Sequence, residues 1–70
     1  MYSVKRLDKN ETIESIYLSD EKTLKFVTKA KVTFAVVNSD GEIVKASNGQ
    51  CEIYTLKKTA QLVADWYNKS

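Results

Sequence analysis

The fold of this chain is decided by residues 23–37, which read TLKFVTKAKVTFAVV. Every second side chain of this stretch is apolar or small, from Leu24 and Phe26 to Val36. A period of two residues places one such set on one face of a β-strand, and the opposite face begins with lysines. We therefore predict a strand over residues 23–37. This stretch exceeds the usual strand length, so a bend or a break is expected near residues 29–31.

The first part of the stretch also fits a helix, over residues 20–31. At about 100° per residue, three apolar side chains would gather on one side of that helix and three lysines on the other. The apolar set is Leu24, Val27 and Ala30, and the lysine set is Lys22, Lys25 and Lys29. β-branched and aromatic residues dominate the later half of the stretch and favour the strand. The alternative architecture is ββα-ββα, with a second helix near residues 20–30.

Polar breaks divide the rest of the chain into short segments. The clearest is Asn48-Gly49, a favoured two-residue hairpin loop, and Gly41 suits a turn with a bulge. The breaks at residues 8–11, 19–22, 38–41 and 48–49 leave predicted strands over residues 2–7, 12–18, 42–47 and 50–54. Short turns between consecutive strands make an antiparallel meander, in which one face packs a core and the other stays wet.

The last segment changes its period, which predicts an amphipathic helix over residues 56–68 with Thr55 as N-cap. The apolar face of that helix comprises Leu56, Ala60, Val63, Ala64 and Tyr67, with Leu62 and Trp66 on one flank. We predict an α+β fold, a small antiparallel β-meander of four to five strands with one C-terminal α-helix packed on one face. With 70 residues and no linker-like tract, residues 1–70 are expected to form a single compact domain.

The composition argues against an enzyme. The chain has no histidine, one cysteine and two isolated glycines, which excludes Ser-His and Cys-His catalysis, thiolate metal clusters and a glycine-rich phosphate loop. Cys51 shares a strand face with Ile53 and is predicted to be a small core residue. We expect no catalytic activity, no cofactor and no metal. No apolar run reaches the length of a signal peptide or a membrane span, so a cytoplasmic protein without a membrane partner is expected.

Two surfaces are candidate binding sites. The apolar arc of the C-terminal helix is wider than one small sheet needs, so Trp66 and Leu62 either curl under the sheet edge or stay exposed as an anchor for a partner. The predicted partner-binding residues are Trp66, Leu62, Tyr67, Tyr54 and Tyr17. The second surface is a lysine cluster of Lys22, Lys25, Lys29 and Lys31, which gathers on one face in either secondary structure.

These surfaces lead to two functional hypotheses. The first is a small non-enzymatic protein-binding module, an inhibitor or modulator of a larger protein, of the type of many small phage or bacterial accessory proteins. A homodimer that forms through the same apolar surface is a further hypothesis. The alternative is a weak, sequence-tolerant nucleic-acid-binding protein that uses the lysine cluster. A net charge of +2 is only a mild basic bias and does not by itself predict nucleic-acid binding.

Overall fold

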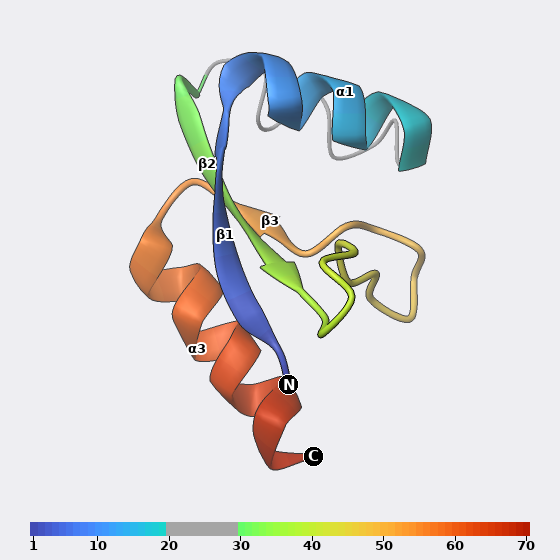
Figure 1. The fold of residues 1–70 in the computed structure, drawn as a ribbon, viewed down its shortest axis with the longest axis vertical. Helices are drawn as coiled ribbons and strands as arrows, with labels where there is room; N and C mark the ends of the chain where they lie inside the picture. The colour runs from blue at the N-terminus through green and yellow to red at the C-terminus, as the bar shows by residue number, and fades with distance from the viewer. Residues whose placement is uncertain (20–29) are drawn as a thin grey trace.

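The computed structural model describes residues 1–19 and 30–70, with side chains for residues 1–16 and 30–70. The elements in chain order are β1 (Ser3–Asp8), α1 (Lys9–Ser19), β2 (Val32–Val37), β3 (Ile53–Tyr54) and α3 (Lys57–Lys69). The strands form one antiparallel sheet in the order β1-β2-β3. In Figure 1, α1 lies across the upper end of the sheet and α3 runs alongside the lower part of β1. The fold is therefore α+β with a C-terminal helix on an antiparallel sheet, as the sequence predicted.

The sheet is smaller than the predicted four to five strands. The segments at 42–47 and 50–54 make only the isolated bridges of Ile43 to Val37 and of Lys45 to Cys51, besides the two residues of β3. Both segments converge on Val36, whose N–H donates to the Glu52 carbonyl at 2.9 Å and whose carbonyl accepts from the Val44 N–H at 2.9 Å. Because one residue of β2 serves both segments, neither extends along β2 as a full strand.

The predicted turn with a bulge at Gly41 is confirmed, and a turn also forms at Asn48-Gly49, although its loop comprises residues 47–49 rather than the predicted two residues. Gly41 and Gly49 have φ angles of 82° and 85°, in the left-handed region that favours glycine. The Gly41 N–H donates to the Asn38 carbonyl at 3.0 Å, and the Gly49 N–H donates to the Ala46 carbonyl at 2.9 Å. These turns fold the chain between β2 and β3 into a compact arm beside the sheet.

The predicted strand at 12–18 is wrong, because these residues belong to α1. The polar break before them is a helix start. The Asp8 carboxylate accepts from the Glu11 N–H at 2.8 Å, and the Glu11 carboxylate accepts from the Asp8 N–H at 3.4 Å. This reciprocal pair is a capping box, which satisfies backbone donors that a helix otherwise leaves unpaired. One turn later, Thr12 and Ile16 are both buried, four residues apart as on one helix face.

Both faces of the sheet are covered, whereas the sequence predicted one wet face. On one face, Leu7, Ala35 and Ile53 pack with Ile16 of α1, and Cys51 is buried in the same cluster. Thr33 belongs to this face and its hydroxyl hydrogen-bonds to that of Thr12. The lysine-rich pattern at residues 25–31 gives way to small and apolar side chains in β2. A buried second face follows from that change.

The other face packs against α3. Ala60 and Ala64 are fully buried against Val36, and their small side chains let the helix approach the sheet closely. The N-cap residue of α3 is Leu56 and not Thr55 as predicted. The Leu56 side chain makes no capping hydrogen bond. At the opposite end, the Asn68 amide accepts from the Tyr2 N–H at 2.8 Å and donates to the Tyr2 carbonyl at 2.9 Å. These two hydrogen bonds fix the end of α3 to the start of β1.

The later part of the predicted 23–37 strand is confirmed as β2. Residues 20–29, for which a strand and a helix compete, lie outside the described residues, and so do Lys22, Lys25 and Lys29. Ala30 and Lys31 are described and belong to neither a strand nor a helix, with a bend at Lys31.

Candidate functional site

Two large apolar side chains project from the outer face of α3. Leu62 is 62% exposed and Trp66, one helical turn later, is 63% exposed. Each lies two residues after one of the buried alanines, which is about 200° around the helix axis. The alanines face the sheet, so these two residues must face outward. The structure therefore places both outside the core.

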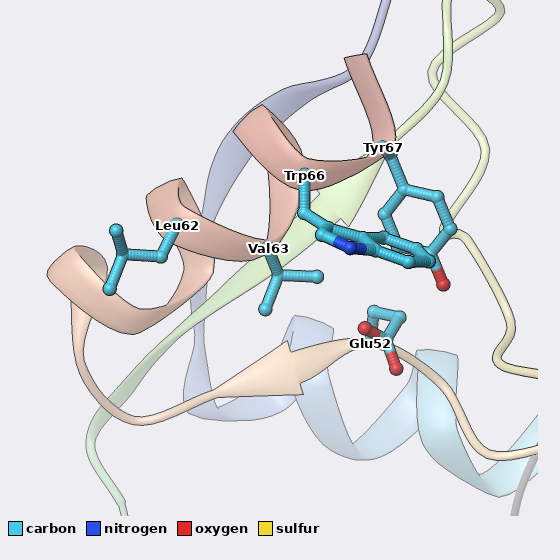
Figure 2. Close-up of a pocket in the computed structure, with 5 residues that line it drawn as sticks. All are labelled: Glu52, Leu62, Val63, Trp66 and Tyr67. Atoms are coloured by element: carbon cyan, nitrogen blue, oxygen red, sulfur yellow. The ribbon is translucent and has the colours of Figure 1, made fainter. Parts of the chain in front are cut away.

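A groove lies beside this pair, between α3 and the segment that leads into β3. Its volume is about 290 Å³, and its lining residues are Glu52, Leu62, Val63, Trp66 and Tyr67. Figure 2 shows the Trp66 indole above the Glu52 carboxylate, with the Tyr67 ring beside it. The two rings meet edge to face, with centroids 5.0 Å apart and an interplanar angle of 81°. We call this the Trp66 groove.

A second hollow lies on the other side of Leu62, toward the start of α3. It has a volume of about 390 Å³ and is lined by Lys57, Lys58, Gln61 and Leu62. The Leu62 side chain thus separates a lysine-bordered hollow from the Trp66 groove. An exposed apolar residue between two hollows gives the outer face of α3 a shape that a partner surface can interlock with.

Glu52 is held in place by a hydrogen bond from the sheet. The Tyr54 hydroxyl donates to Glu52 Oε2 at 2.9 Å. Burial raises the pKa of Tyr54 from 10.0 to about 12, and the hydrogen bond and the negative charge of Glu52 add to the rise. Burial and then the charge of Glu52 also raise the pKa of Tyr67. The groove therefore has a negative floor beneath aromatic rings.

The predicted partner-binding residues do not all meet at one place. Trp66, Leu62 and Tyr67 line the Trp66 groove, and Tyr54 donates a hydrogen bond to Glu52, which also lines it. Tyr17 lies in α1, which packs against the opposite face of the sheet, so it is not part of this surface. Lys31 is exposed just before β2.

Glu52 and Val63 were missed by the sequence reasoning. Glu52 shares a strand parity with Tyr54, which places it on the face that α3 covers. Val63 precedes the buried Ala64 and lies next to Tyr67 on the helix surface. Parity along residues 50–54 was the available signal, but it identifies a site only once the face covered by α3 is known.

Metal-binding groups, membrane-spanning helices and similarity to known proteins bear on the kinds of site present. Among residues 1–16 and 30–70, no group of three or more histidine, cysteine or acidic side chains could hold a metal ion. In the same described part, no helix has the length and apolar character needed to cross a membrane. Comparison with known proteins finds no matching family model, no matching curated protein and no matching solved structure.

The raised pKa of Tyr54 predicts a stability change at high pH. Because the folded-state pKa of about 12 exceeds the unfolded value of 10.0, the folded state holds more protons between these values. The stabilisation is complete below pH 10 and is lost as the pH rises toward about 12. We expect Tyr54→Phe to reduce the fall in unfolding free energy over this window, measured by urea denaturation at successive pH values. If the unfolding free energy of Tyr54→Phe fell with pH as steeply as that of the wild type, the raised pKa of Tyr54 would be contradicted.

Proposed function

We propose that this chain is a small, non-enzymatic binding module that docks a larger protein on the outer face of α3. The observation that carries the proposal is the pair Leu62 and Trp66, one turn apart and both more than 60% exposed. Adjacent exposed apolar side chains of this size are typical of interaction surfaces. Tryptophan in particular is enriched among the residues that dominate interface energies.

The support beneath α3 also favours this function. Ala60 and Ala64 seat the helix on the sheet, and the Asn68 amide ties its last turn to Tyr2. A surface that is already ordered loses less conformational entropy on binding, and more of the contact energy then appears as affinity. By covering part of the partner's surface, such a module would inhibit or modulate that protein. A bacterial or phage accessory protein remains the proposed setting.

The proposal predicts that binding and folding can be separated at Leu62 and Trp66. We expect the double variant Leu62→Ser/Trp66→Ser to keep its fold, because changes at exposed positions usually alter stability by less than about 0.5 kcal/mol each. Loss of two anchors of about 2 kcal/mol each, or about 4 kcal/mol together, would weaken binding by roughly 1,000-fold. The partner is first captured from a nuclease-treated lysate of the source organism, and its affinity for each variant is then measured by calorimetry.

A matched control is Leu56→Ser. Leu56 is 64% exposed but lines neither the Trp66 groove nor the lysine-bordered hollow, so this variant should bind like the wild type. Equal capture by the wild type and the double variant would refute the proposed surface. Capture that disappears with nuclease would instead support the alternative, in which lysines bind nucleic acid.

A further inference from the structure

The Trp66 groove combines features that suit a cation. Its floor is a carboxylate, that of Glu52, and its upper wall is the Trp66 indole, with Tyr67 meeting it at 81° (Figure 2). The face of an aromatic ring carries negative potential and attracts a cation within about 6 Å of its centre. A positive group between indole and carboxylate would therefore be attracted from both sides.

Glu52 is available for such a contact. Its Oε2 accepts from the Tyr54 hydroxyl, which holds the carboxylate in the groove. Within the part of the chain that the structure describes, no lysine or arginine forms an ion pair with Glu52, and Oε1 has no hydrogen-bond partner. One oxygen is thus used to orient the side chain, and the other is open to a donor from outside the molecule.

The remaining lining selects the kind of cation. Leu62 and Val63 supply aliphatic wall on the α3 side, which suits the methylene stem of a long basic side chain. The volume of about 290 Å³ lies just below the range of about 300–1,000 Å³ for small-molecule sites, so one side chain fits it better than a larger ligand. Arginine fits best, because its planar guanidinium stacks on aromatic faces and also donates to carboxylates.

We propose that the Trp66 groove receives an arginine side chain of the protein partner, between the Trp66 indole and the Glu52 carboxylate. This inference rests on the proposed function, since it names the chemistry of the partner at the same face. Lys57 and Lys58 lie about two turns before Trp66, roughly 12 Å along the axis of α3, and give the other end of the face positive charge. The partner segment would then place its arginine at the groove and acidic residues near the lysines, and Glu52 would repel a nucleic-acid phosphate.

Trp66 itself supplies the readout, because it is the only tryptophan in the chain. The probe is the peptide acetyl-Ala-Leu-Arg-Leu-Ala-amide, and its control carries citrulline, a neutral counterpart of arginine, at the central position. We expect the arginine peptide to change the Trp66 emission with a Kd of about 1 mM, and the citrulline peptide to bind about fivefold more weakly. In Glu52→Gln, the two peptides should bind within about twofold of each other.

Glu42→Gln is the matched control variant, because it removes an exposed carboxylate in the turn before Ile43 and should keep the fivefold preference. Circular dichroism checks that both variants fold. Equal binding of the two peptides, a preference that survives Glu52→Gln, or no emission change up to about 10 mM would overturn the arginine site. These outcomes leave the proposed function standing, which fails separately if partner capture is unaffected by the Leu62 and Trp66 substitutions.

Discussion

Replacing Ile16 by alanine is expected to lower the free energy of unfolding by about 2–5 kcal/mol. Ile16 of α1 is fully buried and packs with Leu7, Ala35 and Ile53 of the sheet, so the substitution removes buried methyl groups and leaves a cavity. Proteins of this size have only about 4–10 kcal/mol of stability in total, so much of it would be lost. Urea denaturation followed by circular dichroism measures the change.

Ile13→Ala is the control on the same helix. Ile13 is only half-buried, so its loss should be clearly smaller than that of Ile16. A loss below about 1 kcal/mol for Ile16→Ala, or equal losses at both positions, would show that α1 does not pack on the sheet in this way.

Residues 12–18 also show why the sequence analysis predicted a strand where the structure has a helix. A strand was predicted over 12–18 because polar breaks at residues 8–11 and 19–22 bound this segment and were interpreted as turns between strands. The first of these breaks is instead the capping box of Asp8 and Glu11, which starts a helix at Lys9. A strand would put Glu14 on the same face as Ile16, whereas in α1 Glu14 is exposed and Ile16 is buried.

The parts of the fold that the sequence did predict have local causes. α3 follows from an amphipathic period and β2 from alternation, and the two turns follow from glycines with positive φ. The reduced sheet could not be predicted in this way. It depends on Val36 bonding to both Val44 and Glu52, and contacts between segments far apart in the chain leave no local pattern.

The candidate site likewise has a part that local sequence patterns predict and a part that depends on tertiary contacts. Leu62 and Trp66 were visible as apolar residues beyond what one sheet can cover, since helix periodicity is a local property. Whether they are core or surface depended on which helix face docks, and Ala60 and Ala64 decide this by their small size. The place of Glu52 beneath Trp66 required both the sheet parity and the position of α3.

The position of α3 can itself be tested, because Ala64→Glu would bury a charge at its contact with the sheet. Ala64 is fully buried and packs with Val36 in an apolar cluster. We expect a loss of at least about 3 kcal/mol of unfolding free energy at neutral pH, since an unpaired carboxylate is costly in such surroundings. Burial would raise the pKa of the introduced carboxyl, so the penalty should shrink as the pH falls toward its unfolded value of about 4.3.

Gln61→Glu places the same carboxyl on the exposed side of α3, where it replaces a hydrogen bond to Asp65 by repulsion from Asp65, and the cost should stay near about 0.5 kcal/mol. Thermal melts of both variants at several pH values separate burial from charge. If Ala64→Glu were as mild as the control, α3 would not be seated on the sheet by its alanines. The outward direction of Leu62 and Trp66 would then lose its physical basis, because the same helix rotation that buries Ala64 exposes Trp66.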